Sequence, residues 1–270
     1  MKTLYVSDLD GTLLGSDERT SEHTNRILNG LIESGLLFSY ATARGYLTSR
    51  KVTEGLNVRL PVVVHNGTMI ADCRDGSIIG KNTFGEMGKA LLDTLLAHNI
   101  QPLVYALIDG EQKFSFIESR CSKGTRVFLD TRRNDPRLRP VETVDALYDG
   151  EIYYFTCIDD EEKLRPLYEM YRAQHHCVFD REFYTREYWL EIMPKEATKA
   201  NAIRQLKHLL GCDKVVVFGD GLNDVDMFQM ADEAYAVQNA AEELKQIATA
   251  VIGTNDEDAV ADWLAGHCTR

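Results

Sequence analysis

Residues 5–15 read YVSDLDGTLLG, and the prediction of the fold starts from this stretch. The apolar residues before Asp8 are typical of a buried strand, and Gly11 and Thr12 indicate that a turn follows it. Two carboxylates, Asp8 and Asp10, therefore stand where a strand ends. Because unpaired carboxylates are costly to bury, the pair predicts a neighbouring positive charge.

The segments that follow alternate between helix and strand patterns. Residues 20–36 carry apolar side chains at helical spacing, and residues 36–45 read as a second strand. Residues 60–67, LPVVVHNG, read as a third strand, and their continuous apolar run is typical of a parallel strand covered on both faces. This order predicts an α/β fold with a doubly wound, Rossmann-like parallel sheet.

The pattern changes from about residue 84. A hairpin signal at Asp75-Gly76 precedes this change. After it, a second hairpin signal at Asp109-Gly110, mixed with helices, predicts an α+β insert, in which residues 134–147 read as a loop. The helix and strand alternation returns after Pro194. We therefore predict a catalytic core made of residues 1–83 and 191–270, with an inserted α+β cap domain over residues 84–190.

Composition limits the partners. The chain has 270 residues, of which 44% are hydrophobic, and its net charge is −12. This charge argues against nucleic acid and against an anionic membrane surface, although it permits a small anionic ligand. An apolar segment long enough to cross a membrane and a signal-peptide pattern are both missing, so we expect a cytoplasmic protein. We expect a monomer or a weak homo-oligomer.

Polar residues gather at the predicted carboxyl ends of the core strands, the edge at which open α/β sheets bind ligands. Three acids in one neighbourhood favour a hard divalent cation such as Mg²⁺. An aspartate can attack a phosphoryl group, and a second acid can move the proton. The residues concerned are Asp8, Asp10, Thr42, Arg44, Lys195, Lys199, Asp220, Asn223 and Asp224.

Each motif also has a simpler interpretation. The Asp-x-Asp-Gly stretch alone is compatible with an Asx turn, or with the start of an EF-hand loop, although Thr12 and the missing preceding helix disfavour the latter. Residues 218–224, FGDGLND, form a partial glycine-rich nucleotide turn, but a third glycine is missing. What indicates a functional site is that all of these clusters stand at the predicted ends of core strands.

Four segments together resemble the motifs of the haloacid dehalogenase-like phosphatases: DLDGTLL (8–14), ATAR (41–44), EIMPKEATKA (191–200) and FGDGLND (218–224). The insert resembles the large α/β cap of the Cof-type subfamily. The resemblance implies a Mg²⁺-dependent phosphatase that hydrolyses small phosphorylated metabolites, most commonly sugar phosphates, through an aspartyl-phosphate intermediate.

The resemblance also implies roles for the matching residues. Asp8 would be the nucleophile and Asp10 the general acid and then base, while Mg²⁺ would be held by Asp8, the backbone carbonyl of Asp10, and Asp220. The residues implied in phosphate binding are Leu9, Thr42, Ala43, Lys199 and Asn223, and those in support are Thr12, Arg44 and Asp224. Two departures from the family pattern are Ala43, where glycine is common, and the sequence PKEATKA, in which Lys199 matches the catalytic lysine better than Lys195.

Alternatives stay open at this point. A phosphomutase of the same superfamily would return the phosphoryl group to its substrate, and a receiver-like module would use Asp8 only as a phosphoacceptor. In the insert, Arg120, Lys123 and Arg126 are compatible with a second anion site or with a solvated helix face. Tyr184 and Tyr188, which stand near Arg181 and Arg186 in the sequence, are expected to pack within the cap sheet rather than to stack on a ligand. His65 and Asn66 end the third predicted strand, where turn chemistry accounts for His65.

Overall fold

The structure, a computed structural model, describes residues 1–181 and 187–268. The chain forms two compact units. The first combines Met1–Lys81 with Ala197–Arg270, and the second is the inserted segment Asn82–Glu196. Each unit is built on a central sheet of its own.

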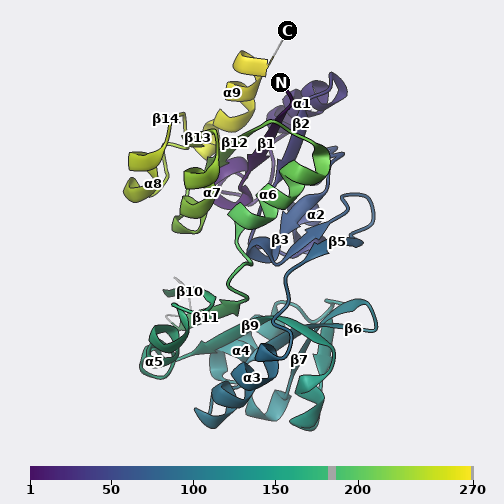
Figure 1. Cartoon of the computed structure of the whole chain (residues 1–270), viewed down its shortest axis with the longest axis vertical. Helices are drawn as coiled ribbons and strands as arrows, with labels where there is room; N and C mark the ends of the chain where they lie inside the picture. Colours follow the sequence, from purple (N-terminus) through teal and green to yellow (C-terminus); the bar gives the residue numbers. More distant parts are fainter. Residues whose placement is uncertain (182–186, 269–270) are drawn as a thin grey trace. The chain divides into compact units, whose positions relative to one another are not determined.

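A five-stranded parallel sheet forms the centre of the first unit, with strand order β14-β13-β12-β1-β2 (Figure 1). Valine and other apolar residues fill β1 and β12, because strands at the centre of such a sheet are covered on both faces. The strands are β1 (Thr3–Ser7), β2 (Leu37–Tyr40), β12 (Lys214–Gly219), β13 (Glu233–Ala236) and β14 (Ala250–Val251). The predicted α/β fold with a parallel core sheet is confirmed.

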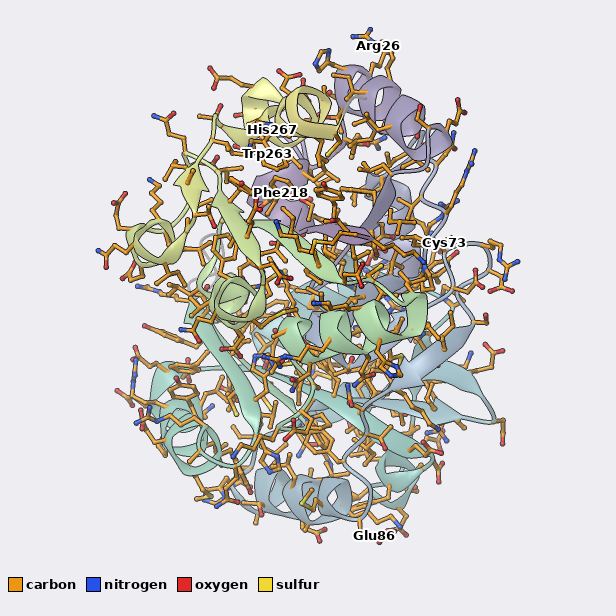
Figure 2. The ribbon with its side chains drawn as sticks, turned by 45° about the horizontal axis from the view of Figure 1, so that its top comes forward. Arg26, Cys73, Glu86, Phe218, Trp263 and His267 are labelled. Atoms are coloured by element: carbon orange, nitrogen blue, oxygen red, sulfur yellow. The ribbon has the colours of Figure 1, made fainter. Side chains whose placement is uncertain are left out.

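Helices cover this sheet. The first and last helices, α1 and α9, pack against each other on one side, and α6 packs beside α7 on the other (Figure 1). Figure 2 shows Phe218 of β12 beside Trp263 and His267 of α9, and the rings of Phe218 and Trp263 lie 5.2 Å apart. The helices are α1 (Glu22–Glu33), α2 (Tyr46–Val52), α6 (Lys199–Leu210), α7 (Val225–Met230), α8 (Glu242–Ile247) and α9 (Ala259–Cys268).

The third predicted strand lies outside the parallel sheet. β3 (Val62–Val64) pairs antiparallel with β4 (Met69–Ala71), and β4 pairs antiparallel with β5 (Ile78–Lys81). A single parallel bridge, Ala41 with Val63, connects β3 to the segment after β2. The predicted parallel pairing with the core is therefore confirmed at this bridge alone, whereas the ladder that β3 forms with β4 is antiparallel. The apolar run reflects burial, and burial is the same for a strand of either direction.

The second unit is built on a six-stranded mixed sheet of order β10-β11-β9-β6-β7-β8, in which β7 and β8 are parallel and the other pairs antiparallel. Leucines of α3 and α5 pack against one face. Phe128 of α4 contacts Trp189 on the other face. The elements are α3 (Met87–Ala97), β6 (Leu103–Ile108), β7 (Glu111–Phe116), α4 (Lys123–Asp130), β8 (Leu138–Pro140), β9 (Glu151–Asp159), α5 (Glu161–Tyr171), β10 (His176–Arg181) and β11 (Tyr188–Met193).

Details of the insert differ from the prediction in one place. Residues 134–147, expected as a loop, contain β8 and most of a short 3₁₀ turn (Asp145–Tyr148). The hairpin turn at Asp109-Gly110 is confirmed in the insert, and the hairpin turn at Asp75-Gly76 is confirmed in the first unit. Tyr188 stacks on Phe179 within the sheet, whereas Tyr184 and Arg186 lie outside the described residues. Across residues 1–181 and 187–268, we find no helix with the length and apolar character needed to cross a membrane.

Candidate active site

Three neighbouring strands of the parallel sheet direct the candidate residues to one edge. Asp8 follows β1, Thr42 closely follows β2, and Asp220 follows β12, and these strands are adjacent in the order β12-β1-β2. The carboxyl ends of parallel strands lie at the same edge, so residues distant in sequence meet there. The fold thus explains why these segments come together.

Lys199 lies at the centre of the group. It is the first residue of α6, whose N-cap Thr198 accepts a hydrogen bond from the Asn201 backbone, and it is only 2% exposed. Its Nζ atom lies 2.8 Å from Asp8 Oδ1 and 2.7 Å from Asp224 Oδ1. Burial lowers the pKa of Lys199, but the carboxylates of Asp224 and Asp8 outweigh burial and raise this pKa above its usual value. The lysine therefore carries its charge in the folded protein.

Asp224 is fully engaged by the protein. While Oδ1 pairs with Lys199, Oδ2 accepts hydrogen bonds from the backbone amides of Asp220, at 3.0 Å, and Gly221, at 3.1 Å. The side chain therefore holds both the lysine and the loop that carries Asp220. This arrangement suits a supporting residue.

Asp220 faces the loop after β1. Its Oδ1 atom accepts a hydrogen bond of 2.8 Å from the hydroxyl of Thr12. Gly11 has φ +72, and a Cβ atom there would lie 2.3 Å from Asp220 Oδ2, so both the backbone and the carboxylate require glycine. Burial, followed by the charge of Asp224, raises the pKa of Asp220 to about 6.

Oxygen atoms of Asp8, Asp220 and Asp224 lie within 4.8 Å of one another. Burial and the charge of Asp224 raise the pKa of Asp8 well above its usual value, and Lys199 only partly opposes this. Lys199 pairs with Asp8 and Asp224, so one positive charge stands beside three carboxylates and an excess of negative charge remains. An all-oxygen group of this kind fits a hard divalent cation, since such ions neutralise charge and prefer oxygen ligands.

The carboxylate of Asp10 is directed elsewhere. Arg44 Nε lies 2.9 Å from Asp10 Oδ2, Arg44 Nη2 lies 2.5 Å from Asp10 Oδ1, and the same Nη2 also contacts Glu18. The Asp10 side chain is 46% exposed. The sequence suggested only a supporting role for Arg44, and nothing in its pattern indicated this bidentate pair.

The implied phosphate-binding residues differ in their exposure to solvent. Thr42 is buried, and its hydroxyl accepts a hydrogen bond of 3.1 Å from the backbone of Arg44. Leu9 is also buried, whereas Ala43 is exposed and Asn223 is half-buried. Lys195 is exposed and belongs to the second unit, unlike Lys199.

A turn to which the sequence pattern assigns no role in the site adjoins two of these residues. His65–Gly67 follows β3, and its backbone donates to the carbonyl groups of Thr42 and Arg44. On another side it approaches the start of α6. The signal in the sequence was the Asn66-Gly67 pair directly after a buried strand.

Comparisons with known proteins agree over nearly the whole chain. A family model described as haloacid dehalogenase-like hydrolase matches residues 5–264. The 5-amino-6-(5-phospho-D-ribitylamino)uracil phosphatase YwtE of Bacillus subtilis is 28% identical over an alignment 283 residues long, gaps included. This alignment covers 98% of this chain and 97% of that protein. Another B. subtilis protein of the same functional name, YitU, is 26% identical, with coverage of 97% and 96%. The crystal structure of TM0651 from Thermotoga maritima has a TM-score of 0.80 at 25% identity and covers 100% of this chain and 99% of that one.

Proposed function

Because the chain belongs to the haloacid dehalogenase-like hydrolase family and is a phosphatase of small phosphorylated metabolites, we propose that it acts through an aspartyl-phosphate on Asp8 with Mg²⁺. We propose further that its substrates are phosphate esters of sugars or sugar alcohols. The observation that carries the mechanism is the buried contact of Lys199 with both Asp8 and Asp224.

Asp8 would begin the reaction. A carboxylate oxygen of Asp8 attacks phosphorus, and the bond between phosphorus and the ester oxygen breaks. Asp10 gives up its hydrogen bonds with Arg44, takes up a proton from solvent and donates this proton to the departing oxygen. Lys199 and Thr42 stabilise the negative charge on the transferring phosphoryl group.

Water completes the cycle. Asp10, now a carboxylate, takes a proton from a water molecule as the water oxygen attacks phosphorus. The bond between phosphorus and Asp8 breaks, so inorganic phosphate leaves and the Asp8 carboxylate is restored. The position of Asp10 only two residues from Asp8, on the same loop, supports the two roles.

The residues present fit a Mg²⁺ site. Asp8 and Asp220 would supply carboxylate oxygens and Asp10 its backbone carbonyl, while Asp224 is already used by Lys199 and two amides. When bound, the cation neutralises charge on the phosphoryl oxygens. Thr12 orients the Asp220 carboxylate for this purpose.

The substrate proposal is supported by the relatives. Two of them are named for a phosphorylated ribitylamino compound, in which the phosphate is esterified to a hydroxyl-rich chain. Sugar phosphates present the same reacting ester and similar hydroxyl groups. A panel should therefore contain sugar phosphates, sugar-alcohol phosphates and the ribitylamino compound, each assayed with Mg²⁺ and with EDTA.

The mechanism is tested with the variant Asp8→Asn and the substrate p-nitrophenyl phosphate. We expect turnover to fall by at least about 10⁴-fold, as for removal of other covalent nucleophiles. Wild-type enzyme quenched during turnover should carry a hydroxylamine-sensitive phosphoryl group that the variant lacks. Normal turnover by Asp8→Asn would exclude the proposed nucleophile, and a rearranged sugar phosphate in place of free phosphate would indicate a mutase.

A further inference from the structure

The turn after β3 retains two features that disfavour folding. His65, Asn66 and Gly67 have φ values of +51, +53 and +93, a region that residues other than glycine seldom adopt. Asn66 is 2% exposed, and none of the described residues forms a hydrogen bond with its Oδ1 atom. Strain of this kind persists where the surroundings enforce it, and it gathers at functional sites.

One side of the turn is fixed to the segment that contains Thr42. The backbone amide of Asn66 donates to the carbonyl of Thr42, and the amide of His65 donates to the carbonyl of Arg44, each at 3.0 Å. The amide of Thr42 donates in return to Val63, also at 3.0 Å. These bonds hold both ends of the segment Thr42–Arg44.

The other side of the turn lies against the start of α6. A Cβ atom added to Gly67 would lie 2.1 Å from the carbonyl oxygen of Thr198 and 2.9 Å from the backbone nitrogen of Lys199. Real Cβ atoms do not approach backbone so closely, so the peptide that precedes Lys199 would have to move. Glycine is therefore required at residue 67 for its lack of a side chain as well as for its φ.

We propose that the His65–Asn66–Gly67 turn is a positioning element of the active site, which sets the spacing between Thr42 and Lys199. It acts through its backbone, because the hydrogen bonds to Thr42 and Arg44 and the close contact with Thr198 are made by backbone atoms. The proposal rests on the proposed function in one respect, that Thr42 and Lys199 both act on the phosphoryl group. A displacement of about 1 Å at such a site costs about 100-fold in rate.

Gly67→Ala tests the proposal, and Gly35→Ala is its matched control. Gly35 has φ +102, but no atom lies within 4 Å of its added Cβ, so this control has the backbone strain without the collision. With p-nitrophenyl phosphate and Mg²⁺, we expect kcat to fall about 100-fold for Gly67→Ala at a KM within about threefold, and at most about twofold for Gly35→Ala. Inhibition by vanadate should weaken in step with kcat, whereas inhibition by phosphate should not, because vanadate resembles the transition state. Equal kcat values for the two variants would overturn the proposal.

A second pair of variants covers the possibility that Gly67→Ala does not fold. Asn66→Gly keeps the left-handed backbone and removes the carboxamide, whereas Asn66→Val has a similar volume but disfavours this backbone. We expect kcat within about threefold of wild type for Asn66→Gly and a loss of at least about tenfold for Asn66→Val. A similar loss in both would show that the carboxamide is needed rather than the turn, and would overturn the proposal. Asp8→Asn, assayed beside them, tests the proposed function separately.

Discussion

Asp8 in the first unit and Glu191 in the second are both acids whose pKa is raised by burial, but their surroundings differ. Lys199 Nζ lies 2.8 Å from Asp8, and the carboxylates of Asp220 and Asp224 adjoin it. Glu191, on β11, is half-buried and accepts a hydrogen bond from the Tyr154 side chain, and its loss of hydration raises its pKa to about 7. The contrast is between a cluster of charges and a single acid.

A single buried acid can avoid its desolvation cost by keeping a proton. The Asp8 cluster has no equally simple solution, because Lys199 balances only one of three carboxylates. The remaining negative charge suits a divalent cation and, with it, a transferring phosphoryl group. A raised pKa therefore indicates a catalytic site here only in combination with its neighbours.

Among the residues around Asp8, the largest effect is expected from removing the lysine of the cluster. Lys199→Met leaves Asp8 and Asp224 buried without their cation, so kcat should fall by about 10³-fold and unfolding free energy by about 3–5 kcal/mol. Steady-state kinetics and urea unfolding measure the two losses. Lys195→Met, at the exposed lysine of the same sequence motif, is the control and should change neither. If kcat of Lys199→Met stayed within tenfold of wild type, the charged neighbour of Asp8 would not be what distinguishes this acid from Glu191.

Replacing Asp220 should affect the response to metal next most strongly. Asp220→Asn keeps the shape of the side chain and removes its charge, so the Mg²⁺ concentration for half-maximal rate should rise by about 10- to 100-fold. Initial rates over a series of Mg²⁺ concentrations test this. Asp226→Asn, exposed on α7, should leave the curve in place. An unchanged curve for Asp220→Asn would remove this residue from the metal site.

Arg44 should have a smaller effect that depends on the leaving group. Arg44→Met leaves the half-exposed Asp10 side chain without the partner that restricts its orientation before it turns to the substrate. We therefore expect kcat/KM to fall about tenfold for alkyl phosphates, which need a proton donor, and little for p-nitrophenyl phosphate. Comparing the two substrate classes makes this test. Arg50→Met, exposed on α2, provides the control. An equal loss with both classes would argue against a link between Arg44 and proton transfer.

Glu191 should give the smallest effect, on stability alone. Its folded pKa of about 7 exceeds the unfolded value, so the folded state binds the proton more tightly, and stability falls as pH rises from about 4.5 to 7. Glu191→Gln removes this dependence. The free energy of unfolding of the variant, taken relative to that of wild type, should therefore be about 1 kcal/mol higher at pH 8 than at pH 4. Urea unfolding at both values tests it, with Glu111→Gln, exposed on β7, as control. A constant difference would mean that Glu191 is charged throughout.

The sequence predicts the parallel core because strand ends, glycines and apolar runs are local signals. β1, β2 and β12 could be recognised in this way, and so could the convergence of Asp8, Thr42 and Asp220 at one edge. The partner of β3 could not be recognised, since three valines are equally compatible with parallel and antiparallel pairing.

Side-chain pairing in the site is also hidden from the sequence. Arg44 is 34 residues from Asp10, and Lys199 is 25 residues from Asp224, so their contacts depend on tertiary packing. The turn at Asn66 illustrates another limit. Asn-Gly predicts a turn after the strand, but only the structure shows the backbone of Thr198 beside Gly67.

The central place of β1 in its sheet has a consequence for synthesis on the ribosome. β1 pairs with β2 on one side and with β12 on the other, and the backbone of Lys2 binds Asp213, 211 residues later. The nascent chain therefore produces the whole second unit, a continuous segment, before the first unit can close its sheet. Asp8 is synthesised long before Lys199, Asp220 and Asp224, so a nascent chain that has not yet reached these residues lacks three of the side chains that complete the site.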